Sequence, residues 1–302
     1  MLTEQSVPPV GEKNRIVPGT LYLVATPIGN LADLSHRAEA VLAGVDFIAA
    51  EDTRNSGRLL AGLGIRKPMV SYFEHNKRER GGQICDRLAA GESCALVTDA
   101  GTPAVSDPGE DLVRLCAARG IPVTSVPGCC AGVTALTLSG LPTGRFTFEG
   151  FLPTDNRQRA ARLNELSRET RTMLFHEAPH RLCETLADFA AVFGGERRIA
   201  LCRELTKRNE ETMRTTTAEA VAYYETHEPR GEYVLVLAGA EEATGEAYHP
   251  PVDEDLLSLS PADHVAHYEA AGLARMDAIK AAARDRGMTK SELYRILTAE
   301  KA

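Results

Sequence analysis

Four short loops in the first half of the chain carry residues whose types suit ligand binding. Each loop follows a run of apolar residues, and three of the four combine glycine and proline with polar or thiol side chains. The loops comprise residues 26–30 (TPIGN), 51–54 (EDTR), 99–103 (DAGTP) and 127–130 (PGCC). The carboxyl ends of parallel strands meet at one edge of an open α/β sheet, and ligands bind there. A single loop of this kind is usually only a turn, but four at successive strand ends predict one shared binding site.

The loop at residues 99–103 indicates what kind of ligand this site would hold. Gly101 allows the backbone to approach a ligand closely, while Thr98, Asp99 and Thr102 offer groups that bind polar atoms. The carboxylate of Asp99 would favour a cation nearby. The loop contains neither the G-x-G-x-x-G pattern nor the lysine of a P-loop. It is therefore glycine-bearing like a nucleotide site, but it lacks the usual phosphate-binding signatures.

Short strands alternate with helices around these loops, which predicts a mostly parallel sheet with helices on both faces. We expect strands at residues 21–25, 46–50, 69–72, 94–97 and 122–126, and helices at 33–43, 54–62, 77–90, 107–120 and 131–139. A boundary follows at residues 141–144 (LPTG). Beyond it, a second alternating unit has predicted strands at 146–149, 172–175, 198–201 and 233–237, and helices at 155–169, 179–193 and 217–226.

The predicted organisation is two α/β domains followed by a small helical module. Residues 1–18 are predicted to be a flexible tail, 19–140 the first domain, 141–240 the second domain, 241–263 an acidic linker and 264–302 the helical module. Within the module, apolar residues recur at the spacing of an amphipathic helix, at Leu273, Met276, Ile279 and Ala283.

The composition gives mixed signals about partners. The chain has 302 residues, a formal net charge of −8, 43% hydrophobic residues and 25% charged residues. A net negative charge weakens a simple interpretation as a nucleic-acid binder, because phosphate binding usually leaves a basic footprint. Residues 272–302, however, contain seven basic and four acidic residues.

The sequence shows no signal-peptide pattern or membrane-spanning run, and its seven cysteines include no C-x-x-C pair. We therefore expect a cytoplasmic protein with reduced thiols.

One short motif imitates a zinc site. Residues 176–180 (HEAPH) match the H-E-x-x-H pattern of zinc proteases, in which both histidines lie on one face of a helix. Pro179 lies inside the motif, lacks a backbone N–H and clashes with the preceding turn. We therefore expect no metal here, and we expect Pro179 to begin a helix whose Arg181 faces the binding cleft.

Longer motifs around the same loops resemble the tetrapyrrole methylase superfamily. They are, in order, LYLVATPIGNLADLS, AAEDTRNSGRLL, SYFEHN, LVTDAGTPAVSDPG and VPGCCAGVTAL, followed by LFHEAPHRL, RELTKRNEE and GEYVLVLAG. The resemblance covers roughly residues 19–240. It implies the class III methyltransferase fold, in which two α/β domains hold S-adenosylmethionine in the cleft between them. A sulfonium cofactor without phosphates would explain why the phosphate-binding signatures are absent.

Within this superfamily, the motifs are most similar to those of the branch that methylates ribosomal RNA. The resemblance implies transfer of a methyl group to the 2′-oxygen of a cytidine ribose in the 16S rRNA of the small ribosomal subunit. It also implies a homodimer and no requirement for a metal. The basic residues of the tail fit an RNA substrate.

The resemblance also implies which residues contact the cofactor. The loop around the methionine part would comprise Asp99, Gly101, Thr102, Pro103, Val105 and Ser106. The residues after the Pro-Gly turn would be Cys129, Cys130 and Ala131. The contacts of the second domain near the adenine would be Glu177, Tyr233, Val234 and Val236. Because Cys129 and Cys130 replace small hydroxyl residues, we expect backbone contacts there.

Polar residues near these loops are candidates for catalysis and RNA binding. A general base would help to remove the proton of the ribose hydroxyl, and the candidates are Asp52, Glu177 and, if burial lowers its pKa, Lys207. Substrate contacts are expected from Glu51, Thr53, Arg54, His75, Asn76, Arg181 and Arg203. RNA phosphates are expected to meet the tail and a basic cluster formed by Arg157, Arg159, Arg162, Arg168 and Arg171.

Two other functions stay open at this point. The same fold also supports methylation of a small tetrapyrrole, although the EDTR and PHR segments and the basic tail argue against it. A non-catalytic RNA-binding or assembly protein is the second alternative, and the intact cofactor loops argue against that. Cofactor binding and the identity of the methylated product distinguish the three functions.

Overall fold

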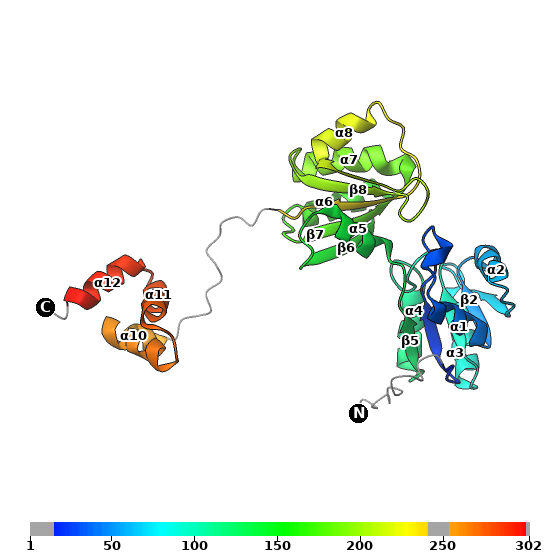
Figure 1. The fold of residues 1–302 in the computed structure, drawn as a ribbon, viewed down its shortest axis with the longest axis horizontal. Helices are drawn as coiled ribbons and strands as arrows, with labels where there is room; N and C mark the ends of the chain where they lie inside the picture. The colour runs from blue at the N-terminus through cyan, green and yellow to red at the C-terminus, as the bar shows by residue number, and fades with distance from the viewer. Residues whose placement is uncertain (1–14, 241–253, 300–302) are drawn as a thin grey trace. The chain divides into compact units, whose positions relative to one another are not determined.

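A computed structural model describes residues 15–240 and 254–299. The chain divides into two compact units, residues 1–241 and 242–302. The larger unit contains two five-stranded sheets, and we call the parts built on them the first lobe (residues 15–140) and the second lobe (residues 141–240). In Figure 1 the first lobe runs from blue to green and the second lobe from green to yellow.

The first lobe is built on a sheet in which every strand is parallel to its neighbours. The strands are β1 (Leu21–Val24), β2 (Phe47–Ala50), β3 (Met69–Ser71), β4 (Cys94–Val97) and β5 (Val123–Val126), in the order β3-β2-β4-β1-β5. The short apolar runs of β2 and β4 are buried along their whole length, as expected of central strands covered on both faces. The predicted parallel sheet is confirmed.

Helices follow the strands of this sheet. They are η1 (Leu31–Asp33, a 3-10 turn), α1 (His36–Gly44), α2 (Thr53–Gly62), α3 (Lys77–Ala89), α4 (Gly109–Ala118) and α5 (Ala131–Ser139). Asp52 starts α2, because its Oδ1 accepts a hydrogen bond from the backbone N–H of Arg54. The helix α5 leaves this sheet and packs against β8 and β10 of the second lobe.

Residues 15–18 are folded rather than part of a free tail. Ile16 packs against the apolar cluster that contains Val41, and the N–H of Val17 donates to the hydroxyl of Tyr22 at 2.8 Å. The predicted tail of residues 1–18 is therefore wrong at its end, and residues 1–14 lie outside the described part of the chain.

The second lobe contains a sheet of mixed direction, which the sequence did not predict. Its strands are β6 (Phe146–Phe151), β7 (Thr172–Glu177), β8 (Arg198–Arg203), β9 (Glu211–Thr216) and β10 (Tyr233–Leu237), in the order β6-β7-β10-β8-β9. Strands β6 and β7 are parallel, and the other neighbours are antiparallel. Strand β9 is missing from the prediction because it is an edge strand of polar composition (ETMRTT) without a buried face.

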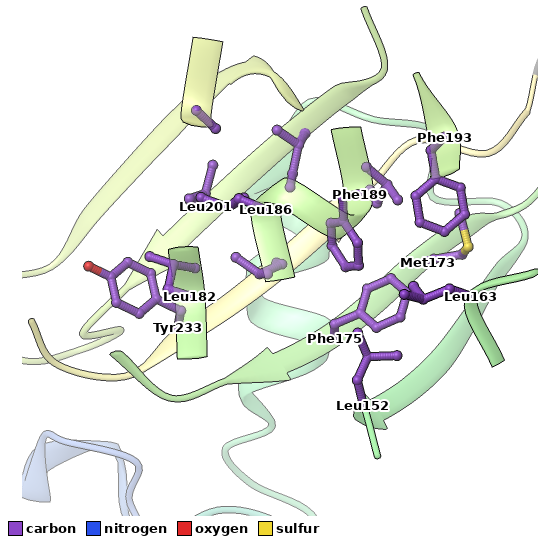
Figure 2. Packing of buried hydrophobic residues seen from close by; sticks show 14 of the residues in the cluster. Leu152, Leu163, Met173, Phe175, Leu182, Leu186, Phe189, Phe193, Leu201 and Tyr233 are labelled. Atoms are coloured by element: carbon purple, nitrogen blue, oxygen red, sulfur yellow. The ribbon is translucent and has the colours of Figure 1, made fainter. Parts of the chain in front are cut away.

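The two faces of the second sheet are covered by different helices. On one face lie α6 (Asn156–Leu166), α7 (Pro179–Phe193) and α8 (Thr217–Tyr224), and on the other lies α5. The strands alternate accordingly: Phe175 and Tyr233 point into the core beneath α7, whereas Leu174 and Val234 point towards α5. Figure 2 shows the core beneath α7, where Phe189 packs beside Phe175 and the Tyr233 ring lies near Leu182.

The smaller unit is helical in its described part. It contains α9 (Glu254–Ser258), α10 (Pro261–Ala270), α11 (Arg275–Asp285) and α12 (Lys290–Ala299), the orange-to-red helices of Figure 1. Its core contains Ile279, Ala283 and Leu293, but Leu273 and Met276 are exposed, so two of the four predicted apolar positions are wrong. The predicted linker at 241–263 is wrong where α9 and the start of α10 lie, and residues 241–253 are outside the described part.

Two further observations bear on the sequence analysis. All seven cysteines are free, and Cys85, Cys94, Cys116 and Cys202 are buried in the cores of the lobes. Among the described residues, no helix has the length and apolar character needed to span a membrane.

Candidate functional site

A cavity of about 370 Å³ is lined by residues of both lobes. The first lobe contributes residues that follow β1, β4 and β5: Ile28, Ala100, Gly101, Thr102, Val105, Cys130, Ala131 and Gly132. The second lobe contributes Phe148, Phe151, His176, Glu177, Ala178, Pro179, Cys202, Glu204, Leu205, Lys207, Glu232, Tyr233 and Val234. A volume in the range of roughly 300 to 1,000 Å³ is typical of small-molecule sites.

Three of the four predicted loops converge on this cavity. Thr26 and Gly101 exchange two backbone hydrogen bonds, of 2.9 and 3.1 Å, and the hydroxyl of Thr102 donates to the carbonyl of Cys129 at 2.8 Å. Gly101 has a φ of +83°, a conformation that favours glycine, and a Cβ there would lie 3.3 Å from Ile28. The first lobe's side of the cavity, which we call the wall, therefore consists of three loops that hydrogen bonds hold together.

The second lobe's side of the cavity, which we call the floor, contains a row of paired residues on three neighbouring strands. Val234 of β10 is in register with His176 of β7 on one side and with Cys202 of β8 on the other. All three belong to the sheet face that carries α5, and all three line the cavity. The floor is therefore a largely apolar part of one sheet face, with one imidazole in it.

His176 is the functional candidate that the sequence analysis missed. Its ring lies edge-on to Phe148 and Phe151, with centroids 5.3 and 5.5 Å away. Its Nε2 is buried and has no hydrogen-bond partner within the described chain. Burial lowers the pKa of His176, and Glu232 opposes that shift. The alternation along β7, in which His176 follows Leu174 by two residues, was the available signal.

A β-bulge brings the two phenylalanines to the same imidazole. Phe148 and Phe151 are three residues apart, so a regular strand would point them to opposite faces. The register of β6 against β7 shifts between Phe148 and Gly150, and Gly150 has a φ of +63°. The extra residue turns Phe151 back to the face of Phe148.

Glu177 reaches the cavity through its backbone position, while its carboxylate lies on the opposite sheet face. It is 3% exposed, and its Oε2 accepts from the hydroxyl of Thr185 at 2.5 Å while its Oε1 accepts from the N–H of Ala178 at 2.9 Å. Thr185 in turn accepts from Nη2 of Arg159 at 2.8 Å. The carboxylate is engaged inside the core, so the hypothesis that Glu177 is the general base is wrong.

The other two candidate bases are held by ion pairs. Nζ of Lys207 lies 2.8 Å from a carboxylate oxygen of Glu204 and 2.8 Å from one of Glu232. Burial alone would lower the pKa of Lys207, but the two hydrogen bonds outweigh it and the pKa is raised, contrary to the condition set for a lysine base. Hydrogen bonds from the side chain and backbone of Arg54 lower the pKa of Asp52 to about 2, which makes it a weak base.

Some of the predicted cofactor residues line the cavity, and the others lie behind the residues that line it. Gly101, Thr102, Val105, Cys130, Ala131, Glu177, Tyr233 and Val234 line the cavity, whereas Asp99, Pro103, Ser106, Cys129 and Val236 do not. Tyr233 contributes its backbone position, because its ring lies in the core of Figure 2 and its hydroxyl pairs with that of Tyr224. Val236 is fully buried under α5.

The predicted substrate residues lie off the cavity wall, and most have structural partners. Asn76 Nδ2 donates to the carbonyl of Ser71, Arg203 forms an ion pair with Glu211 at 3.0 Å, and Arg181 donates to the carbonyls of Leu152 and Pro153 rather than facing the cleft. Glu51, Thr53 and Arg54 gather at the end of β2, and His75 is exposed before α3. Burial and the neighbouring Asp99 raise the pKa of Glu51.

The predicted basic cluster of the second lobe is largely neutralised by carboxylates. Arg159 is 3% exposed and binds Asp188 at 2.6 Å, so it cannot meet RNA. Arg162 binds Glu149 and Glu165, and Arg171 binds Glu169. Arg157 and Arg168 are the members of the cluster without an ion pair to any described residue.

The residues that imitate a zinc site are divided between two elements. His176 lies in β7, and His180 lies in α7, which Pro179 begins. His176 faces the cavity and His180 is exposed, so the two imidazoles do not share a helix face.

Comparison with known proteins gives consistent results. The family model described as tetrapyrrole (corrin/porphyrin) methylases matches residues 20–221. The ribosomal RNA small subunit methyltransferase I of Halalkalibacterium halodurans is 46% identical over 298 residues, which is 98% of this chain and 99% of the relative. The protein of the same name from Pseudomonas aeruginosa is 51% identical over 230 residues, covering 76% of this chain and 82% of the relative.

Solved structures agree with the fold. The uroporphyrin-III C-methyltransferase from Thermus thermophilus in complex with S-adenosylhomocysteine matches with a TM-score of 0.52 and 18% identity. The match covers 73% of this chain and 97% of that one. A cobalt precorrin-4 methyltransferase matches with a TM-score of 0.54 and 16% identity, covering 77% of this chain and 98% of that one. At these identities the likeness describes the fold.

The buried chain Arg159–Thr185–Glu177 generates a stability prediction. We expect Thr185→Val to lower the free energy of unfolding by about 1–3 kcal/mol, because a buried guanidinium and a buried carboxylate each lose a partner. Denaturant unfolding measures the change, and Thr185→Ser, which keeps the hydroxyl, is the matched control. Equal stability of the valine and serine variants would contradict the importance of this hydroxyl.

Proposed function

The chain belongs to the tetrapyrrole methylase family, and from this premise we propose that it methylates the 2′-oxygen of a cytidine ribose in 16S rRNA of the small ribosomal subunit, using S-adenosylmethionine. The observation that carries the proposal is the 42–51% identity to proteins named ribosomal RNA small subunit methyltransferase I, three of which match over more than nine-tenths of this chain. The structural neighbours named after tetrapyrroles are 16–20% identical and bear on the fold alone.

The cavity suits the cofactor in size, lining and charge. Its apolar floor of Cys202, Val234 and His176 suits a planar adenine, and Gly101 leaves room where a side chain would intrude. At its rim two carboxylates, Glu204 and Glu232, share Lys207, which leaves a net negative charge that suits a sulfonium cation. When bound, the cofactor supplies an activated methyl group.

We propose that His176 hydrogen-bonds the adenine through Nε2. This atom is a buried polar group without a partner in the described chain, and such a group costs free energy until a ligand satisfies it. The edges of Phe148 and Phe151 fix the imidazole in place from two sides. A neutral ring is able to donate or accept at this position, according to its tautomer.

Catalysis by this chain rests mainly on positioning. The methyl group leaves an already activated sulfonium, so holding the ribose hydroxyl in line with it supplies much of the rate enhancement. The bonded strand ends at Thr26, Gly101 and Cys129 form a rigid wall for that purpose. Of the two carboxylate candidates for the base, Asp52 lies outside the core at the same sheet edge as these loops, whereas the Glu177 carboxylate is buried.

The direct test of the function is a methylation assay on isolated small ribosomal subunits. We expect purified protein with S-adenosylmethionine to add one 2′-O-methyl group to a cytidine of 16S rRNA, and disruption of the gene to remove that mark. Methylated precorrins as the product would instead support a tetrapyrrole methylase. Failure to bind S-adenosylmethionine in calorimetry would support a non-catalytic role.

Three further parts of the proposal follow from the resemblance or from the substrate. An enzyme acting on ribosomal RNA works where ribosomes assemble, so we place it in the cytoplasm, which cell fractionation tests. We propose a homodimer, and a monomer mass in light scattering at micromolar concentration would contradict it.

We also propose that the smaller unit binds ribosomal RNA, through exposed basic residues that form no ion pair with described residues: Lys280, Lys290 and Arg295.

The first prediction concerns the loop at residues 99–103. Gly101→Val should weaken the binding of S-adenosylmethionine strongly, because Gly101 lines the cavity in a left-handed conformation that valine rarely adopts. Asp99→Ala should have a smaller effect, since Asp99 lies behind the wall. Calorimetry measures both affinities, with circular dichroism to check folding. Unchanged affinity in both folded variants would place the cofactor elsewhere.

The second prediction concerns His176 and pH. We expect cofactor affinity to be constant above about pH 7 and to fall below about pH 6.5, as protonation places a cation beside the sulfonium cofactor. Of the charged groups at the cavity, Glu204 has a lowered pKa and Lys207 a raised one, so neither titrates in this window. His176→Phe should bind roughly threefold to tenfold more weakly at pH 7.5 and lose the acid-side fall. A fall that persists in the His176→Phe variant would contradict its assignment to His176.

The third prediction concerns the smaller unit. A chain that ends at Ala240 should bind S-adenosylmethionine normally, because every residue lining the cavity precedes that point. It should methylate the small ribosomal subunit poorly, with a raised KM for RNA. Normal methylation would rule out the RNA-binding role of residues 254–299, and loss of folding would instead support a stabilising role.

A further inference from the structure

The surface formed by α2 and the loop that follows it is unusually basic. From Thr53 to Phe73 the chain has four basic residues, Arg54, Arg58, Arg66 and Lys67, and no acidic one. Arg58 and Arg66 are exposed, and neither forms an ion pair with any residue in the ranges 15–240 and 254–299. We call the segment 53–67 the α2 surface.

Several cations on other helices of the first lobe are neutralised by carboxylates. On α3, Arg87 binds Glu92 at 2.6 Å, and at the end of α4, Arg119 binds Asp86 at 2.7 Å. Arg114, also on α4, binds Glu110 and Asp111. Arg78 and Arg80 of α3 are also exposed and form no ion pair with a described residue, but Glu79 lies between them, whereas the α2 surface contains no acidic residue.

The α2 surface also contains a hollow beside exposed glycine residues. A hollow of about 460 Å³ is lined by Gly57, Ala61, Gly64, Arg66 and Lys67, among others. A Cβ added at Gly64, or at Gly62 beside it, would meet no atom within 4 Å. The absence of side chains at Gly62 and Gly64 leaves room for a phosphodiester chain to approach the neighbouring Arg66 and Lys67 closely.

The α2 surface is linked to the cavity. Helix α2 starts at the end of β2, and Asn55 on its first turn donates to Asp99 Oδ2 at 3.3 Å, in the loop that lines the cavity. From there the helix extends about 15 Å away. Arg54 and Arg58 share one helix face, about 6 Å apart along the axis, which is close to two nucleotide rises.

We propose that the α2 surface binds phosphates of the RNA chain that flank the nucleotide placed in the cavity. The inference rests on the proposed function and extends it, because it assigns the path of the substrate to a surface outside the cavity. Arg58 and Arg66 supply the main contacts, and Asp52 holds Arg54 in place at the start of the path.

The test compares two double variants of the full chain. Arg58→Gln/Arg66→Gln removes two unpaired cations, and Arg114→Gln/Arg119→Gln removes two paired cations from the same lobe. Binding to a labelled single-stranded fragment of 16S rRNA is measured across a salt series. We expect the first variant to bind more weakly and to reduce the slope of log affinity against log salt by about 1.4, or roughly 0.7 for each lost phosphate contact. The control should keep the wild-type slope.

Further measurements separate this inference from the proposed function. Arg58→Gln/Arg66→Gln should raise the KM for RNA while leaving kcat and the affinity for S-adenosylmethionine unchanged. A wild-type slope in this variant would overturn the role of the α2 surface while leaving the methyltransferase intact. Loss of cofactor binding would also overturn it, because the effect would then lie in the cavity. Wild-type protein that fails to methylate small subunits would refute the proposed function itself.

Discussion

The alternating direction of side chains along β7 is the constraint on which the site depends. His176 and Glu177 are neighbours in sequence, yet one faces the cavity and the other faces the core beneath α7. This separates a ligand-facing imidazole from a carboxylate that Thr185 and Arg159 hold in the interior. The same alternation places Val234 and Cys202 in the cavity floor and sends the Tyr233 ring to the other side, as Figure 2 shows.

Close approach of the two lobes completes the cavity. Gly29, in the loop after β1, lies against residues 205–207, and a Cβ there would collide with Leu205, Thr206 and Lys207. Two residues of the facing loop, Glu204 and Thr206, have positive φ angles without being glycine. Such backbone strain is kept only where surrounding contacts determine it. The rim that holds Lys207 between its carboxylates is thus fixed by backbone geometry as well as by charge.

The sequence predicted the first lobe well because its strands are short and separated by glycine and proline, and because the central strands β2 and β4 are fully buried apolar runs. It predicted the second lobe less well, because strand direction there depends on long-range pairing that local pattern does not encode, and because β9 is a polar edge strand. For the site, loop convergence was predictable from strand ends. The roles of Glu177 and Lys207 were not, because a carboxylate or an ammonium group looks the same in sequence whether it faces a cavity or a buried partner.

The bulge in β6 has a consequence for how this strand tolerates change. Phe148 and Phe151 are three residues apart, and they share a face because one extra residue between them interrupts the regular alternation of the strand. Deleting Glu149 would remove the extra residue and place Phe148 and Phe151 two residues apart, so both rings would still share one face of a regular strand. A one-residue deletion here would therefore preserve the facing of both rings, and what the bulge adds is the extra residue Glu149, whose carboxylate forms an ion pair with Arg162 of α6.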